Sequence, residues 1–205
     1  MNNRQFKTVF LGSSNVGKSC IVKRIVNNQY DGKTEPTIGS SFLSKTININ
    51  GEDITFQLWD TAGQEAFRAL TKIYYRCIQS QIAILVYDIT NKDSFRSLAR
   101  WHEDLKENCD GKRMILALCG NKVDLENDVV TYTEAKKFAV SINAELFLVS
   151  AKTGQGIEGL IQIKYRGNVR QSWHHGIPNG IRESEFVRGT SKSLYQVQQK
   201  NKKCC

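Results

Sequence analysis

Near its beginning the chain reads Gly12-Ser13-Ser14-Asn15-Val16-Gly17-Lys18-Ser19, which fits the phosphate-binding pattern of one glycine, four residues and then Gly-Lys-Ser. A β-prone run, residues 6–11, precedes it, and residues 20–26 can form a helix, so the loop joins a strand to a helix as the pattern requires. Its glycines allow successive backbone N–H groups to converge, and the following helix N-terminus adds partial positive charge. The pattern predicts that Lys18 reaches the terminal phosphates and that the Ser19 hydroxyl binds Mg²⁺.

Composition indicates one globular domain with a basic appendage. The chain has 205 residues, 40% of them hydrophobic, and a net charge of +9. Residues 162–205 carry nine Lys or Arg against two Glu, or +7, which leaves +2 for the rest. Such a basic segment is typical of binding to nucleic acid or to an anionic membrane surface. No apolar run approaches the length of a membrane-spanning helix, and Asn2 excludes N-myristoylation.

The cysteines point away from disulfides and zinc. Four of the six stand alone, without zinc-ligand spacing, and no signal peptide is present. We expect these four to be reduced core residues: Cys20, Cys77, Cys109 and Cys119.

Strand-like and helix-like segments alternate along the chain, which favours an α/β fold with a mainly parallel sheet. The expected strands cover residues 6–11, 41–48, 55–60, 82–87, 115–119 and 146–149. The second and third flank Asn50-Gly51, a hairpin signal, and so form one antiparallel edge. Apolar spacing predicts one helix with a face from Phe95 to Leu105, and Thr131 with Glu134 predicts a capping box on another. Residues 66–78 could form an irregular helix.

Asp60-Thr61-Ala62-Gly63-Gln64 follows the third strand. A carboxylate at that strand end can hold Mg²⁺, and Gly63 allows the backbone to approach a terminal phosphate. Gln64 is a candidate catalytic residue because it can orient a water for in-line attack.

The nucleotide base is expected at two later strand ends. Asp124, in Asn121-Lys122-Val123-Asp124, only accepts hydrogen bonds, and guanine offers two adjacent donors where adenine offers an acceptor. The Lys122 stem can lie on the base plane, and Ser150-Ala151-Lys152 can supply a backbone N–H to the base oxygen. The sequence therefore predicts guanine rather than adenine binding at the carboxyl edge of the sheet.

These residues resemble the small GTPases of the Ras superfamily, and specifically Rab proteins, from about Lys7 to Gly159. Further matching motifs are Pro36-Thr37-Ile38-Gly39, Trp59 to Glu65, Tyr74-Tyr75-Arg76 and Tyr87-Asp88-Ile89-Thr90; residues 37–43 look most like the early-endosomal subgroup. The resemblance implies nucleotide binding by Ser14, Asn15, Val16, Gly17, Lys18, Ser19, Cys20, Tyr30, Thr37, Gly63, Asn121, Lys122, Asp124, Ser150, Ala151 and Lys152. It implies Mg²⁺ ligation by Ser19, Thr37 and Asp60, and effector binding by Ile38, Phe42, Trp59 and Tyr74.

The resemblance also implies a fold and a domain layout. We expect a small G domain at residues 1–166, with a six-stranded, mostly parallel sheet, helices on both faces and one antiparallel edge strand. Residues 167–205 form an irregular basic tail that ends in a double prenylation site, Cys204 and Cys205. The family's long final helix is cut short here: Ile157 to Arg166 keeps helical spacing, and residues 168–190 do not resemble the family. A gene-prediction error and a true divergence both remain open for that segment.

The function expected from the resemblance is a GTP-hydrolysing switch that recruits effectors to membranes in vesicular, endosomal trafficking. Its partners are GTP, GDP, an activating protein, an exchange factor, a prenyl-dependent chaperone and effectors, with no nucleic acid, and it acts as a monomer. It is placed on the cytoplasmic face of intracellular membranes, with a cytosolic pool. The alternatives are a nucleotide-dependent binding module with negligible hydrolysis, a P-loop kinase or ATPase, which Asn121 to Asp124 disfavours, and nucleic-acid binding by the tail.

Overall fold

The computed structural model describes residues 4–32, 37, 39–49, 51–63, 81–108 and 114–163, all within the first of two compact units, residues 1–167. Several predictions concern residues outside these ranges. They are the roles of Gln64, Ile38 and Tyr74, the helix at residues 66–78, the burial of Cys77 and Cys109, and everything predicted for the tail. Those predictions stand on the sequence alone.

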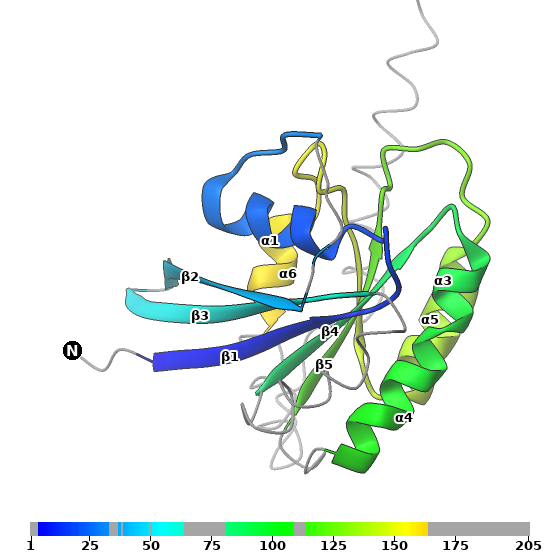
Figure 1. The fold of residues 1–205 in the computed structure, drawn as a ribbon, viewed down its shortest axis with the longest axis horizontal. Coiled ribbons are helices and arrows are strands. Elements are labelled where there is room, and N and C mark those ends of the chain that lie inside the picture. Colours follow the sequence, from blue (N-terminus) through cyan, green and yellow to red (C-terminus); the bar gives the residue numbers. More distant parts are fainter. Residues whose placement is uncertain are drawn as a thin grey trace, which may run out of the picture. The chain divides into compact units, whose positions relative to one another are not determined.

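A single six-stranded sheet forms the centre of the domain (Figure 1). Its strands are β1 (Arg4–Leu11), β2 (Ser40–Ile49), β3 (Glu52–Thr61), β4 (Ile82–Asp88), β5 (Ile115–Asn121) and β6 (Glu145–Leu148), in the order β2-β3-β1-β4-β5-β6. Only β2 and β3 pair antiparallel; the other pairs are parallel. The predicted fold class, with β2 as its antiparallel edge strand, is confirmed.

β2 and β3 form the predicted hairpin, with Gly51 at its turn. Gly51 has φ 84°, a left-handed conformation that a glycine adopts without steric cost, and its N–H donates to Asn48 Oδ1 at 3.1 Å. Trp59 pairs with Phe42 across the hairpin, in the register that continues to Ser40 and Thr61.

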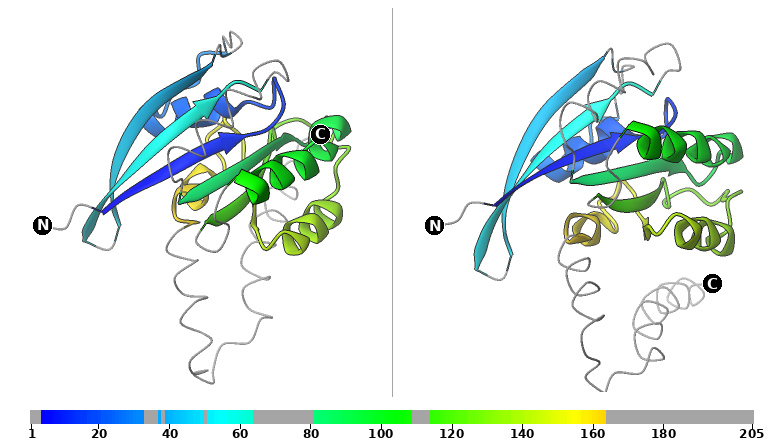
Figure 2. Two further views of the ribbon diagram at one scale, coloured as in Figure 1. Left: turned by 60° about the horizontal axis from the view of Figure 1, so that its bottom comes forward. Right: turned by 90° about the horizontal axis from the view of Figure 1, so that it is seen from below.

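Helices cover both faces of the sheet, as predicted (Figures 1 and 2). On one face lie α1 (Lys18–Asn27) and α6 (Ile157–Ile161), and on the other α3 (Lys92–Arg96), α4 (Leu98–Asn108) and α5 (Tyr132–Ser141). β4 lies in the middle of the sheet and is buried at every position, which explains its continuous apolar run. Within the described residues no helix is both long and apolar enough to cross a membrane.

Local signals explain two of these helices. The capping box of α5 is present: Thr131 Oγ1 accepts from the Glu134 N–H, and the Glu134 carboxylate accepts from the Thr131 N–H. The single helix predicted around Phe95 to Leu105 is wrong in one respect, because it is divided at Ser97 into α3 and α4. The Ser97 hydroxyl donates to the Ser94 carbonyl at 2.8 Å, a local bond that competes with regular helix pairing.

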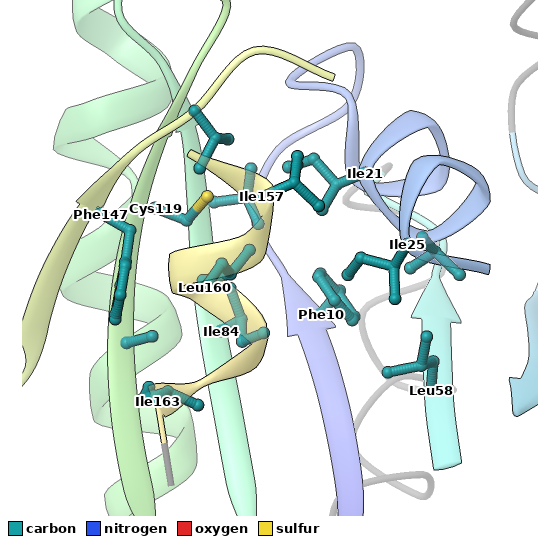
Figure 3. Close-up of a cluster of buried hydrophobic side chains, with 14 of the residues drawn as sticks. Phe10, Ile21, Ile25, Leu58, Ile84, Cys119, Phe147, Ile157, Leu160 and Ile163 are labelled. Carbon is teal, nitrogen blue, oxygen red and sulfur yellow. The ribbon is translucent and has the colours of Figure 1, made fainter. Parts of the chain in front are cut away.

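The face that carries α1 and α6 encloses an apolar core (Figure 3). Leu160 and Ile163 are 1% and 2% exposed and pack with Phe10, Ile25 and Ile84. Cys20 and Cys119 are free thiols in the same core, as predicted for them. The regular part of the final helix, α6, covers Ile157–Ile161, and the predicted extension to Arg166 lies outside the described residues after Ile163. A glycine inside so short a helix, Gly159, weakens it further.

Candidate nucleotide-binding site

Parallel strands β1, β3, β5 and β6 end at one edge of the sheet, and the residues predicted from sequence gather there around a cavity of about 360 Å³. The lining residues are Ser14, Asn15, Gly17, Lys18, Ser19, Cys20, Tyr30, Thr37, Gly63, Asn121, Lys122, Asp124, Leu125, Ala151 and Lys152. Fourteen of these fifteen are among the predicted nucleotide-binding residues; Leu125 is the addition. The structure thus brings the separate motifs to one place, and their roles in binding remain predictions.

The loop between β1 and α1 needs its glycines for close approach. Gly12 and Gly17 have φ 144° and 91°, and a Cβ on Gly17 would lie 2.3 Å from Asn121 Nδ2. Asn15 also adopts a left-handed conformation, with φ 62°. The loop therefore turns tightly, passes close to the base-binding motif and delivers the N-terminus of α1 to the cavity.

Lys18 lies beneath the phosphate loop and is hydrogen-bonded to it. Its ammonium donates to the carbonyls of Gly12 at 2.9 Å and Ser13 at 2.8 Å, and the residue is 5% exposed. Burial lowers the pKa of the Lys18 ammonium to about 8, against the opposing effect of the nearby Asp60 carboxylate. A phosphate in the cavity would place a negative charge beside this buried cation.

Three predicted metal ligands lie together. Ser19 Oγ and Thr37 Oγ1 are 2.8 Å apart, and Thr37 Oγ1 donates to Asp60 Oδ2 at 3.5 Å. Asp60 is 3% exposed, and its Oδ1 has no hydrogen-bond partner among the described residues. Burial raises the pKa of Asp60, although hydrogen bonds from Ser19 and Thr37 and the Lys18 charge oppose the rise. Two hydroxyls and a buried carboxylate with an unpaired oxygen form the hard oxygen set that Mg²⁺ prefers, so these residues fit the ion.

Gly63 lies directly against the phosphate loop. A Cβ at this position would be 2.4 Å from Lys18 Nζ and 2.5 Å from the Ser13 carbonyl. Since the Ser13 atoms belong to the backbone, no side chain can be accommodated without moving the loop. The chain is thereby brought close to the place where a terminal phosphate would lie, immediately before Gln64.

At the base end, hydrogen bonds position the Asp124 carboxylate. Ser150 Oγ donates to Asp124 Oδ1 at 2.6 Å, and Lys152 Nζ lies 3.8 Å from Asp124 Oδ2. The Ser150 N–H donates to the Gln155 carbonyl and the Gly154 N–H donates to the Ser150 carbonyl, which closes the loop after β6. Ser150 is 0% and Val16 1% exposed, and neither lines the cavity, so their predicted roles in nucleotide binding remain predictions. The Ser150 side chain contacts Asp124 rather than the cavity.

Lys122 has a partner that the sequence reasoning did not anticipate. Its ammonium pairs with Asp88 Oδ2 at 2.5 Å, while Asp88 Oδ1 accepts from the Thr90 N–H and hydroxyl at 2.8 and 2.7 Å. Lys122 also adopts a left-handed conformation, φ 73°. Burial alone would raise the pKa of Asp88, but the hydrogen bonds from Lys122 and Thr90 outweigh it and lower the pKa below its usual range.

Comparison with known proteins agrees with this geometry. The Ras family model matches residues 7–167. The chain is 43% identical over 159 residues to the putative ras-related protein Rab-5B of Dictyostelium discoideum, covering 77% of this chain and 72% of the relative. It is 45% identical over 156 residues to bovine (Bos taurus) Ras-related protein Rab-21, covering 76% and 69%. It is also 40% identical over 204 residues to human Ras-related protein Rab-31, covering 98% of both chains.

This chain is a Rab-type small GTPase of the Ras family. It binds guanine nucleotides, hydrolyses GTP to GDP and phosphate, and works as a switch in Rab-mediated vesicle trafficking. The family model matches this Rab chain as far as residue 167. It therefore extends beyond Gly159, where the resemblance in sequence motifs ends.

Two of the residues predicted to meet effectors are described in this Rab protein, and they touch each other. Phe42 is 49% exposed, and its ring centroid lies 5.0 Å from that of Trp59. The other two, Ile38 and Tyr74, lie outside the described residues. The antiparallel pairing of β2 with β3 therefore places an exposed ring, Phe42, against the half-buried ring of Trp59.

Two residues near the site escaped the sequence reasoning. Leu125, 44% exposed, lines the cavity beside Asp124 and carried no signal beyond following the motif. Arg24 belongs to α1 and bonds the loop after β6, 127 residues later in the chain. As a basic residue near a helix C-terminus it is indistinguishable in sequence from an ordinary capping residue.

Proposed function

We propose that the cavity binds GTP and GDP with the phosphates on the Gly12–Ser19 loop and the guanine against Asp124. One observation carries this proposal: Lys18, the sole cation buried beneath the phosphate loop among the described residues, lines the same cavity as the Asp124 carboxylate. Guanine presents two adjacent donors that a carboxylate can accept together, and adenine does not. Tyr30, 41% exposed at the cavity rim, is placed to pack on the nucleotide.

The proposed metal is Mg²⁺, held by Ser19, Thr37 and Asp60. When bound there, the ion would neutralise charge on the β- and γ-phosphates. Thr37 belongs to the segment before β2, so a bond between its hydroxyl and the occupied metal site would order that segment in the GTP state. Loss of the γ-phosphate would remove the partner of Thr37 and Gly63, which is the proposed basis of switching.

Hydrolysis is proposed to use Gln64 to orient the attacking water. No arginine occurs between Asn28 and Thr37, so the chain has no internal arginine finger there. Intrinsic turnover should then be about 10⁻⁴–10⁻³ s⁻¹, with acceleration by an activating protein. A single-turnover assay tests this directly. Gln64→Leu should hold the GTP state, and equal rates for the two proteins would refute the role of Gln64.

In the GTP state the protein is proposed to recruit effectors through Ile38, Phe42, Trp59 and Tyr74, and to act as a monomer. An exchange factor and a prenyl-dependent chaperone complete the cycle. The contact between the exposed Phe42 and the half-buried Trp59 supports this, because aromatic side chains are enriched at interface centres. Binding of a candidate effector should require GTP and should be lost on Phe42→Ala. If the effector still bound in the GDP state, the proposed GTP-dependent recruitment would be wrong.

Membrane attachment is proposed to use prenyl groups on Cys204 and Cys205, with the lysines at 202 and 203 as a second signal. We propose endosomal membranes, facing the cytoplasm, together with a cytosolic pool. Deleting Cys204 and Cys205 should move the protein to the soluble fraction of cells without changing nucleotide binding. Gln198→Ala with Gln199→Ala, which keeps both cysteines and all the lysines, is the matched control. If the deleted protein stays on membranes, the anchor lies elsewhere.

A further inference from the structure

Arg24 connects the helix behind the phosphate loop to the loop expected to face the base. Its Nε donates to the Ala151 carbonyl at 2.8 Å, and one terminal nitrogen donates to the Lys152 carbonyl at 2.6 Å. The other terminal nitrogen donates to the Asn28 carbonyl at 2.8 Å, at the end of the same helix. Figure 1 shows α1 beside the segment that leads into α6. One guanidinium therefore holds two consecutive carbonyls of the loop after β6.

The two long-range bonds fix the direction of a peptide plane. The Ala151 C=O and the Lys152 N–H belong to one trans peptide and point in opposite directions. When Arg24 holds that C=O toward α1, the Lys152 N–H points away from α1. Both residues line the cavity, so this N–H is the backbone donor that a nucleotide in the cavity could reach. A hydrogen bond from a cation to the carbonyl also polarises the peptide and strengthens its N–H as a donor.

The neighbouring peptide is held from the other side. Asn121 Oδ1 accepts from the Ala151 N–H at 3.1 Å, and the Ser150 hydroxyl accepts from the Thr153 N–H at 3.0 Å. Arg24 is thus the residue by which α1 holds this loop. The other two bonds come from Asn121 at the end of β5 and from within the loop. A role in capping α1 alone would need only the bond to Asn28, and it would leave the contacts with residues 151 and 152 unexplained.

We propose that Arg24 is a positioning residue that aims the backbone N–H of Lys152 at the 6-oxygen of guanine, because the Ala151 N–H already donates to Asn121 Oδ1. This rests on the proposed binding of guanine at Asp124. The planar fork of arginine suits two adjacent carbonyls, whereas the compact ammonium of lysine would serve one. Arg24 acts on the base oxygen only through the loop, and Asp124 acts on the two donors of the base.

The test uses the full chain and the Arg24→Met variant. The dissociation constant for GDP should rise roughly tenfold, since bonds from a charged donor are lost. Lys23→Met is the control: Lys23 is the preceding residue of α1 and pairs with Asp31 at an exposed position, 3.1 Å away. The control should bind GDP like the unaltered protein. Should Arg24→Met fail to fold, Arg24→Lys replaces it, with a smaller loss expected.

Base analogues separate positioning from general structural damage. Inosine diphosphate lacks the exocyclic amine but keeps the 6-oxygen, so the loss caused by Arg24→Met should persist with it. The diphosphate of 2-aminopurine riboside lacks the 6-oxygen, so the loss should vanish with it. An equal loss for all three nucleotides, or no loss for GDP, would overturn the proposal. If the unaltered protein bound ADP as tightly as GDP, the proposed site itself would be wrong, which is a separate result.

Discussion

Asn121 joins the base-binding motif to the phosphate loop: its Nδ2 donates to the Val16 carbonyl at 2.8 Å, across 105 residues of chain. The same amide accepts the Ala151 N–H on its Oδ1 at 3.1 Å, and the residue is 2% exposed. One buried side chain therefore sets the spacing between the loop for the phosphates and the loop for the base. Gly17 makes room for it, since a Cβ there would clash with the Asn121 amide.

Asn121→Ala should weaken both nucleotide binding and the fold. It leaves the Val16 carbonyl and the Ala151 N–H without their partner, and each buried unsatisfied group costs about 1–3 kcal/mol. We expect the free energy of unfolding with saturating GDP to fall by about 2–4 kcal/mol, measured by urea denaturation. Asn108→Ala is the control, because the Asn108 amide bonds only the Asp104 carbonyl of its own helix in the described contacts. Equal losses in the two variants would count against the coupling role.

Gly63→Ala and Gly159→Ala should have opposite effects. At Gly63 the added Cβ meets the backbone of Ser13, so the phosphate loop must shift and GDP should dissociate roughly tenfold faster, the size expected of overpacking. At Gly159, inside α6, nothing lies within 4 Å of the added Cβ, and stability should rise by about 0.5–1 kcal/mol. Release of a fluorescent GDP and thermal unfolding measure the two effects. Unchanged release from Gly63→Ala would show that the loop tolerates the methyl group.

Asp88 should make the free energy of unfolding depend on pH. Its pKa is lowered in the folded protein, because the bonds from Lys122 and Thr90 outweigh the effect of burial. Asp88 therefore stabilises the fold above its unfolded pKa, and that contribution disappears as pH falls through the lower folded value. The Asp88→Asn protein should have a lower free energy of unfolding than the unaltered protein at pH 6. This gap in free energy should narrow as the pH falls below about 4. Urea denaturation at pH 6 and pH 3 measures it; a constant gap would exclude the ionised carboxylate as its cause.

Leu160 tests how much the short final helix contributes. It is 1% exposed and packs in the core with Phe10 and Ile84 (Figure 3). Leu160→Ala should destabilise the protein by about 2–5 kcal/mol, a large part of the 5–15 typical of a domain. Val140→Ala, on α5 and 67% exposed, should change stability by less than about 0.5 kcal/mol. A Leu160→Ala protein as stable as the Val140 control would mean that α6 adds little to the core.

The sequence predicted the fold well where the pattern was local and strong. The alternation of strands, the hairpin with its glycine turn at Gly51 and the Thr131–Glu134 capping box each have a short-range physical cause, and each was confirmed. The division of a helix at Ser97 was missed because it depends on the direction of one hydroxyl, which apolar spacing does not encode.

The site was predictable to the extent that its residues lie in contiguous motifs at strand ends. Lys18, Asp60 and Asp124 fall where the parallel sheet brings strand ends together: Lys18 and Asp124 line one cavity, and Asp60 accepts a hydrogen bond from Thr37, which lines it too. Asp88 and Arg24 were missed because their contacts cross the fold: Asp88 pairs with Lys122, and Arg24 reaches residues 151 and 152. In sequence each reads as an ordinary charged residue at the end of an element, and only the tertiary arrangement shows its partner.

Titration calorimetry of the Mg²⁺-loaded protein with GTP and with ATP tests the central claim most directly. The account predicts that GTP binds more tightly by roughly 10⁴-fold, because adenine leaves the Asp124 carboxylate unpaired. Asp124→Asn should weaken GTP binding by more than the roughly 1–3 kcal/mol of one unsatisfied group, because the amide offers one acceptor oxygen where the carboxylate offers two. Equal affinity of the unaltered protein for ATP and GTP would contradict the assignment of the cavity to guanine.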